Sequence, residues 1–334
     1  MPVLATEKNR RLQELLRSRE FFDIVGVTNA LQARLVELAG VPVTYVGGGI
    51  FTSHILGLPD IAFMSRNELI WFASRVSAVV DIPVLCDSDQ GFGTAVQVRR
   101  TVHEFIQAGI SGIHIEDQPA NRRCGFLAGK TVCSIEEAVL KYKAAVAAKN
   151  ELDPNFVIIA RCDARTAVNG GLETTIERLK AYEAAGVDML YFEGPQSPEE
   201  IKMVRAETKL PLIATLFGWS DQPDREVQKK WGLSATFFPE LLVYPQNMAV
   251  YDFLQDWKKR GVAAYRDVRA KSDKHPIGGL RWFDFDGLRE WGEWEKKYVP
   301  ADQIPTQRGK GLGVHDPYEA TDVKRQAADA TAAD

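Results

Sequence analysis

Acidic side chains that close short apolar runs are the groups of this sequence best suited to chemistry. Such runs are typical of buried strands, and each ends abruptly in a carboxylate. The acids are Asp60, Asp87, Asp89, Glu116 and Glu193. A lone Asp-x-Asp ahead of a glycine is more typical of a helix-capping turn. Several carboxylates at successive strand ends instead indicate a site for a hard divalent cation, which is magnesium or, alternatively, manganese.

A cysteine in a basic, glycine-containing loop is the second candidate for chemistry. Arg122 and Arg123 directly precede Cys124, and Gly125 follows it. Because neighbouring cations lower the pKa of a thiol, we expect Cys124 to be reactive and to lie on a mobile loop. The alternative is a surface loop with an incidental cysteine. The four cysteines lack the spacing of a zinc site or a disulfide framework, which favours a reduced, cytoplasmic setting.

Eight strand-then-helix units must position these groups. Counted from Phe22, apolar runs of strand length alternate with segments of helical period up to residue 238. Strict alternation implies a parallel sheet, and eight units imply a closed (β/α)8 barrel. An open doubly wound sheet is the alternative, but no Gly-x-Gly-x-x-Gly follows the first strand. In a barrel, the chemistry lies at the C-terminal ends of the strands, where most of these acids and Arg161 fall.

Composition narrows the class of protein and its partners. The chain has 334 residues, of which 45% are hydrophobic, enough for a sizeable core. Its net charge of -4 and the lack of a basic stripe argue against nucleic acid or an acidic membrane as a partner. We expect no membrane span and no export signal. The expected domains are the barrel with its N-terminal helix (1–250), a helical aromatic-rich segment for subunit contacts (251–300) and an extended, partly disordered tail (301–334).

Six motifs occur in a fixed order along the chain. They are Thr44-Tyr-Val-Gly-Gly-Gly49, Leu56-Gly-Leu-Pro-Asp60, Asp87-Ser-Asp89-Gln-Gly-Phe-Gly93, Ile115-Glu-Asp117, Arg122-Arg-Cys124-Gly and Ala160-Arg-Cys-Asp163-Ala. Together they resemble the isocitrate lyase and phosphoenolpyruvate mutase superfamily, in particular the short 2-methylisocitrate and dimethylmalate lyases. The resemblance implies a magnesium-dependent lyase that cleaves a 2-hydroxy carboxylate into a 2-oxo acid, such as pyruvate or glyoxylate, and a second carboxylate. It also implies a barrel whose last helix is exchanged between subunits, in a homotetramer built as a dimer of dimers.

The resemblance assigns a role to each of these positions. Asp89 corresponds to the direct magnesium ligand, and three further acids hold the water shell of the metal: Asp60, Asp87 and Glu116. The expected substrate-binding residues are Tyr45, Gly48, Gly49, Arg123, Gly125, Arg161 and Glu193. The expected catalytic residues are Cys124, as general acid on the gating loop, Arg161 and Tyr45. We expect Asp163 to orient Arg161 and His114 to be a core residue, with contact to the site as the alternative.

Several positions depart from the pattern of these lyases. Gly47 stands where serine is usual, Phe126 where histidine is usual, Arg122 for lysine and Cys162 for threonine. After the seventh strand, a polar signature with Asn and Glu becomes Ala214-Thr-Leu-Phe-Gly218. These changes favour a substrate that is less carboxylated or more apolar than isocitrate or methylisocitrate. An oxaloacetate hydrolase or decarboxylase, a phosphonopyruvate enzyme that acts on a P–C bond, and a non-catalytic binding barrel remain as alternatives.

Overall fold

The computed structural model describes residues 3–279 and 281–304. The chain divides into two compact units, with the boundary between Tyr244 and Pro245. The first unit contains all the described strands. Within the described residues, no helix is both long enough and apolar enough to cross a membrane.

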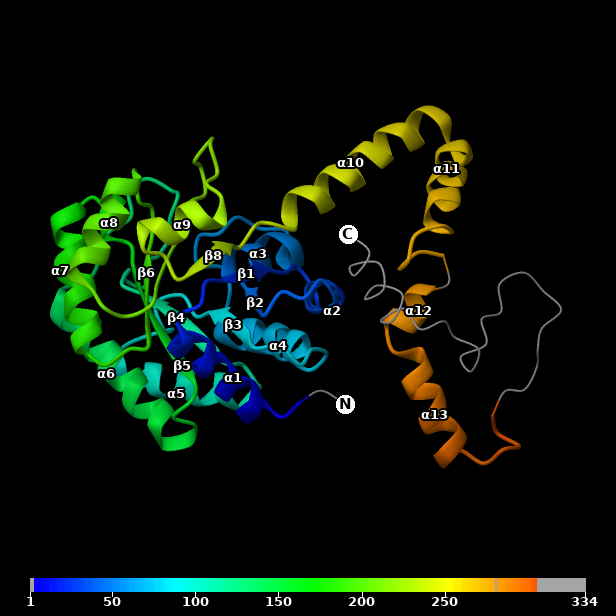
Figure 1. Ribbon diagram of the computed structural model, residues 1–334, viewed down its shortest axis with the longest axis horizontal. Coiled ribbons are helices and arrows are strands. Elements are labelled where there is room, and N and C mark those ends of the chain that lie inside the picture. Colours follow the sequence, from blue (N-terminus) through cyan, green and yellow to red (C-terminus); the bar gives the residue numbers. More distant parts are fainter. Residues whose placement is uncertain (1–2, 280, 305–334) are drawn as a thin grey trace. The chain divides into compact units, whose positions relative to one another are not determined.

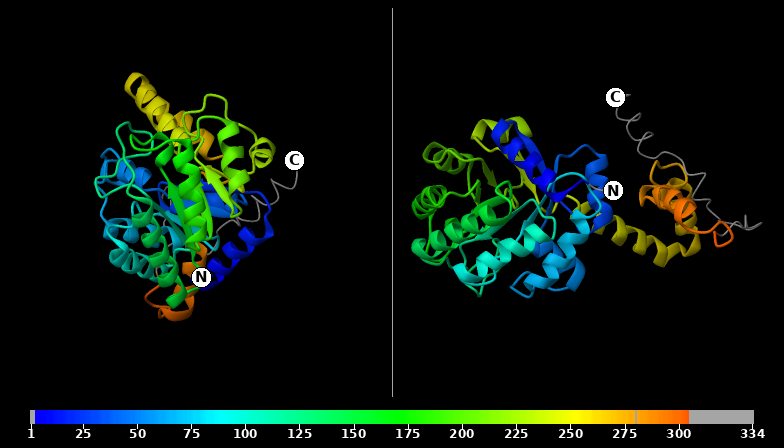
Figure 2. Two further views of the ribbon diagram at one scale, coloured as in Figure 1. Left: turned by 90° about the vertical axis from the view of Figure 1, so that its left-hand side faces the viewer. Right: turned by 90° about the horizontal axis from the view of Figure 1, so that it is seen from below.

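Eight parallel strands build the first unit (Figures 1 and 2). They are β1 (Phe22–Gly26), β2 (Val43–Val46), β3 (Val84–Asp87), β4 (Gly112–Glu116), β5 (Val157–Cys162), β6 (Met189–Phe192), β7 (Leu212–Ala214) and β8 (Ala235–Phe238). Each strand pairs with its neighbour in sequence from β1 to β7, and β1 also pairs with β8. Ser234 N donates to Leu212 O at 2.8 Å, which brings β7 and β8 together. The predicted (β/α)8 barrel is therefore confirmed.

Helices alternate with these strands and cover the barrel (Figure 1). They are α1 (Ala5–Ser18), α2 (Ala30–Leu38), α4 (Arg66–Ser77), α5 (Ala95–Gln107), α6 (Ile135–Leu152), α7 (Leu172–Ala184), α8 (Pro198–Glu207) and α9 (Arg225–Trp231), with a 3-10 turn, η2 (Ala164–Thr166), after β5. The expected helices and strands from residue 22 to 238 are confirmed, with ends displaced by a few residues. Leu12 and Leu16 of α1 pack on side chains inside the barrel, so this helix covers the N-terminal end of the strands.

A short helical segment follows β2 where the sequence suggests a loop. Three consecutive glycines favour irregular backbone, yet α3 (Gly48–Phe51) and η1 (Thr52–Leu56) form there. Phe51 is buried, and Thr52 Oγ1 donates to Gly48 O at 2.9 Å, so burial and a side-chain bond stabilise the turn. Asp60 consequently follows a helix, and the expectation that it ends a strand is wrong.

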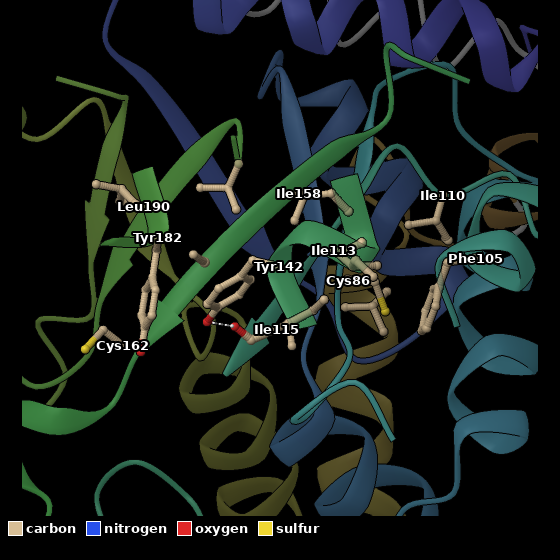
Figure 3. Close-up of a cluster of buried hydrophobic side chains, with 14 of the residues drawn as sticks. Cys86, Phe105, Ile110, Ile113, Ile115, Tyr142, Ile158, Cys162, Tyr182 and Leu190 are labelled. Carbon is tan, nitrogen blue, oxygen red and sulfur yellow. Dashed lines mark hydrogen bonds between the residues drawn. The ribbon is translucent and has the colours of Figure 1, made fainter. Parts of the chain in front are cut away.

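Apolar side chains form one layer inside the barrel and a larger layer between strands and helices. Figure 3 shows part of the outer layer, where Phe105 of α5 lies near Cys86 and Ile113 of the strands. In the same layer Tyr142 Oη donates to Ile115 O at 2.9 Å, which satisfies a buried hydroxyl. Cys86 and Cys162 are buried in this core.

Helices α10 (Val243–Arg260), α11 (Val262–Ser272), α12 (Arg281–Phe285) and α13 (Leu288–Tyr298) follow the barrel. Many of their large apolar side chains are exposed, and α10 has no buried residue. The exposed set includes Met248, Tyr251, Leu254, Trp257, Trp291 and Trp294. The predicted tail lies outside the described residues from position 305 onward.

Candidate active site

Successive side chains of a strand point to opposite faces of the sheet, and this alternation directs the candidate catalytic side chains into the barrel. Ile113 and Ile115 of β4 belong to the outer apolar layer, so His114 and Glu116 point inward. The same alternation on β5 packs Cys162 outward and turns Arg161 inward. Each inward group lies near the C-terminal end of its strand. The sequence prediction that these strand ends carry the polar groups is confirmed for β3, β4 and β5.

An unusual backbone conformation directs Asp89. Its φ of 45° lies in the left-handed region, which aspartate tolerates better than most residues. Asp89 N donates to Asp87 Oδ1 at 2.8 Å, and Asp89 O accepts from Glu116 N at 2.9 Å. These bonds fix the turn after β3 against the end of β4. Strained backbone of this kind is a feature of functional sites.

The guanidinium of Arg122 lies among the acids and is directed away from the Cys124 thiol. Its Nε donates to Glu116 Oε1 at 2.7 Å, its Nη1 lies 3.3 Å from Asp89 Oδ1, and the same nitrogen contacts Asp60. Burial raises the pKa of Glu116 to about 7 against the opposing effect of Arg122. Burial also raises the pKa of Asp89 well above its ordinary value, and the neighbouring carboxylates add to the rise. One guanidinium therefore offsets only part of the negative charge here.

The residues present fit a magnesium ion that keeps much of its water. All the candidate donors are oxygens, and Asp89 Oδ1 is buried without a hydrogen-bond partner in the described structure. Among described residues, no three His, Cys, Asp or Glu side chains are close enough to enclose a metal ion. Magnesium commonly binds through one or two carboxylates and retains several waters, so this donor set suits it. A closed four-ligand site of the zinc type would not form here.

The pKa of the Cys124 thiol is raised, contrary to the expectation of a lowered one. Burial raises the pKa of Cys124 to about 11. Arg122 is engaged with the acids, and Arg123 Nη1 donates to Ala128 O at 2.9 Å, so neither arginine is committed to the sulfur. Adjacency in sequence does not fix where a long side chain points. A thiol that keeps its proton suits a general acid better than a nucleophile.

Gly125 allows the Cys124 loop to approach the strand ends. A Cβ on Gly125 would clash with Glu193 Oε1 and lie 2.7 Å from Arg161 Nη2. Arg161 Nη2 lies 3.6 Å from Glu116 Oε2 and 3.7 Å from Glu193 Oε2. Within the described structure Glu193 Oε1 is buried and has no hydrogen-bond partner. The loop, Arg161 and two carboxylates thus meet at one point of the barrel mouth.

Gly48 and Gly49 pack their backbone directly against acids. Gly48 N donates to Asp87 Oδ2 at 3.0 Å, so in this structure the amide is bound to the protein itself. A Cβ on Gly49 would lie 3.0 Å from Asp60 Oδ2. The two glycines therefore link the segment after β2 to the acidic group.

His114 is buried in the core, as expected, and it also contacts Tyr45, one of the expected site residues. Its Nε2 lies 2.7 Å from Tyr45 Oη, and its Nδ1 has no hydrogen-bond partner among described residues. Burial lowers the pKa of His114 to about 4, so the ring is neutral at neutral pH. The signal that could have identified this pair is the position of His114 between two outward isoleucines of one strand.

Comparison with known proteins identifies the family. The profile of the phosphoenolpyruvate phosphomutase family matches residues 12–242, more than half of the chain. The chain belongs to this family, within the isocitrate lyase superfamily. A 2-methylisocitrate lyase of Shewanella oneidensis is 35% identical over 271 residues, which cover 79% of this chain and 91% of that protein.

Two solved structures of the superfamily share the fold of this lyase. Oxaloacetate acetylhydrolase in complex with 3,3-difluorooxalacetate matches with a TM-score of 0.79 and 30% identity, over 87% of this chain and 97% of that one. A phosphonopyruvate hydrolase in complex with oxalate and Mg²⁺ matches with a TM-score of 0.77 and 26% identity, over 88% of this chain and 99% of that one. Members that bind similar small acids thus catalyse different bond cleavages.

An aromatic pair distinguishes the mouth of this lyase. The rings of Phe126, on the Cys124 loop, and Phe217, after β7, lie 4.3 Å apart at their centroids. Leu216 beside Phe217 is buried. From the sequence, we expect these positions to be among those that depart from the polar pattern of the lyases that the chain resembles. They form an apolar contact between the two loops.

Proposed function

We propose that this lyase cleaves the carbon-carbon bond of a 2-hydroxy carboxylate to a 2-oxo acid, such as pyruvate or glyoxylate, and a second carboxylate. The observation that supports it most is the convergence of Arg161, the protonated Cys124 and the Tyr45–His114 pair beside a partly uncompensated group of acids. Each group matches one requirement of such a cleavage. These are a carboxylate anchor, a proton donor, a pair that orients the hydroxyl group and a cation site.

Magnesium, when bound, supplies a Lewis acid for the oxygen that becomes the carbonyl. Asp89 would hold it directly, and Asp60, Asp87 and Glu116 would hold its waters. Arg161 binds the substrate carboxylate, and its buried position strengthens that charge-assisted contact. Tyr45 Oη, held by His114 Nε2 2.7 Å away, would bind the substrate hydroxyl and orient it.

Cys124 then delivers its proton to the carbanion that the cleavage leaves. With a pKa of about 11, the thiol carries this proton at neutral pH. The loop that bears Cys124 packs on Glu193 and Arg161 through Gly125, which places backbone where bulk water would otherwise reach the carbanion.

We infer that the second product carries an alkyl group in place of an additional carboxylate, as in a dimethylmalate-like substrate. Phe126 and Phe217 offer no charge or hydrogen bond to a further carboxylate, whereas they would pack on methyl groups. The departure of these residues from the lyase pattern supports this assignment.

The decisive experiment is a magnesium-dependent assay against dimethylmalate, methylisocitrate, isocitrate, oxaloacetate and phosphonopyruvate, with release of oxo acid and phosphate as readouts. We expect dimethylmalate-like substrates to be favoured, and Phe126→His to shift the ratio of kcat/KM toward methylisocitrate by about 10- to 100-fold. Phe21→His, directly before β1 at the opposite end of the barrel, is a matched control. Efficient cleavage of methylisocitrate by the unmodified protein would refute the alkyl assignment, and cleavage of oxaloacetate or phosphonopyruvate alone would select those alternatives.

We further propose that the second unit mediates assembly into a homo-oligomer, with a dimer of dimers as the expected form. The exposed aromatic and aliphatic side chains of α10 and α13 support this, because isolated proteins rarely leave so many exposed together. Light scattering of the full chain tests it, and a monomer at micromolar concentration would contradict it.

A further inference from the structure

Asp163 connects to Arg161 by two hydrogen bonds. Asp163 follows β5, and its side chain is fully buried. Arg161 Nε donates to Asp163 Oδ2 at 2.8 Å, and Arg161 Nη2 donates to Oδ1 at 3.0 Å. This paired geometry fixes the plane of the guanidinium as well as its position. The expectation that Asp163 orients Arg161 agrees with these contacts.

Lys130 connects the same carboxylate to the loop that carries Cys124. Lys130 is a lysine with only 2% of its surface exposed, which is rare unless the ammonium group is paired. Its Nζ donates to Gly125 O at 2.6 Å and to Asp163 Oδ1 at 3.3 Å. One ammonium group therefore joins the residue after Cys124 to the residue that holds Arg161.

Gln118 makes the corresponding connection on the other side of Cys124. Gln118 Oε1 accepts from Arg123 N at 3.1 Å, and Nε2 donates to Arg123 O at 2.9 Å. The same nitrogen donates to Asp163 Oδ1 at 3.1 Å. Both chain neighbours of Cys124 are thus tied, through buried side chains, to one carboxylate.

We propose that Gln118, Lys130 and Asp163 form a clamp that holds the Cys124 thiol at a fixed distance from the Arg161 guanidinium. All three are positioning residues, because they act through Cys124 and Arg161. The catalytic consequence rests on the proposed function: a thiol that protonates a substrate anchored by Arg161 must keep a set position. Displacement of a reacting group by about 1 Å can cost 100-fold in rate.

The first test measures the clamp without any substrate. Lys130→Met keeps the length of the side chain and removes its charge, and we expect alkylation of Cys124 by iodoacetamide, followed by peptide mass spectrometry, to be about 10- to 100-fold faster. This factor corresponds to the loss of one hydrogen bond to a charged group. Lys149→Met is the matched control, because Lys149 is also buried and donates to both oxygens of Asp188 at 2.6 Å.

Lys149 lies on α6, and its partner directly precedes β6, at the N-terminal end of the barrel. We expect Lys149→Met to leave the alkylation of Cys124 unchanged. Unchanged reactivity in Lys130→Met would overturn the clamp. So would a rise in both variants accompanied by labelling of Cys86 and Cys162, since these core thiols react only when the barrel itself opens.

A second variant covers the case in which Lys130→Met does not fold. Gln118→Leu removes the bonds to Arg123 but leaves the Lys130 bridge, so we expect a smaller rise in Cys124 alkylation. If the lyase activity is found, both variants should lower kcat by about 10- to 100-fold and change KM by less than about threefold. A purely structural role would lower the amount of folded enzyme without this split and would contradict the proposal.

The two readouts separate the clamp from the proposed function. Protection of Cys124 that depends on Lys130, in a protein that cleaves no 2-hydroxy carboxylate, would support the clamp and refute the lyase assignment. Cleavage that is insensitive to both variants would support the lyase and refute the clamp.

Discussion

Buried charges are arranged differently at the two ends of the barrel. At the N-terminal end, Lys149 Nζ donates to both oxygens of Asp188, and Asn9 Nδ2 donates to Asp153 Oδ2 at 2.9 Å. At the C-terminal end, several carboxylates share the guanidinium of Arg122. The Lys149–Asp188 pair gives each charge a committed partner, whereas the acids around Arg122 keep negative charge that is only partly offset.

This difference in charge pairing indicates that one end of the barrel serves stability and the other serves chemistry. Polar contacts at the N-terminal end join α1, α6 and the start of the strands, and loss of Asp188 would leave the ammonium group of Lys149 buried without its counter-charge. At the other end, burial and mutual repulsion raise the pKa of Asp89 and Glu116, which is unfavourable until a cation arrives. The N-terminal end therefore contributes to the stability of the fold, whereas the C-terminal end carries the groups for binding and chemistry.

The largest expected effect comes from exchanging Asp89 at the C-terminal end for asparagine. Oxo-acid release should fall by about 1000-fold or more, as it should on chelation, because the direct ligand of the cation is lost. The metal-free variant should be more stable by about 1 kcal/mol, because one buried, partly uncompensated charge is removed. Steady-state kinetics and thermal unfolding, each with and without magnesium, measure both effects.

Asp188→Asn is the control at the N-terminal end of the barrel, and it should lower stability while leaving activity unchanged. We expect it to lose about 3 kcal/mol of stability, because Lys149 is left buried without its counter-charge, and to keep its activity when folded. Equal effects of the two variants on stability would mean that the ends do not differ as the contacts indicate.

Cys124→Ser should have the next largest effect, since general-acid catalysis contributes about 100- to 10,000-fold. The thiol acts while protonated, so activity should persist from neutral pH upward and be lost as the pH rises through about 11. The serine variant should lack this decline. A pH profile of kcat checks this prediction. A decline below the ordinary thiol pKa of about 8.5 would instead support the lowered pKa of Cys124 that the sequence alone predicts.

Sequence periodicity was sufficient to predict the barrel and most strand-end groups. Each strand of the barrel is a short apolar run, and each following helix has its own apolar stripe, so local patterns and the global fold agree. The prediction that Asp60 ends a strand was wrong because three glycines do not indicate a helix. The helix that precedes Asp60 is stabilised by the burial of Phe51.

Side-chain partners were beyond the reach of the sequence. Arg122 contacts Asp60, which lies 62 positions away, and this approach depends on how two loops fold over the barrel mouth. The contact of His114 with Tyr45 could not be read from the chain, because it depends on the registers of β2 and β4, which lie on either side of β3. Such contacts depend on tertiary packing, whereas the strand pattern is visible in a few consecutive residues.

The smallest expected effect is on stability in acid, and it concerns His114. Burial lowers the pKa of the folded-state imidazole to about 4 from its ordinary 6.5. The unfolded chain therefore binds a proton at a higher pH than the folded chain does. The resulting stability is present above about pH 6.5 and is lost as the pH falls toward 4, by roughly 1–3 kcal/mol.

Replacement of His114 by asparagine should remove this part of the acid dependence, measured by urea unfolding at several pH values between about 4 and 7. His103→Asn on α5 leaves the Tyr45–His114 pair intact and should retain it. A loss that persists in His114→Asn would assign the acid sensitivity to other groups. The groups to test would then be carboxylates with lowered pKa values, because the stability that they contribute is lost as the pH falls. Asp163 is one, since Arg161 and Lys130 lower its pKa against the effect of burial.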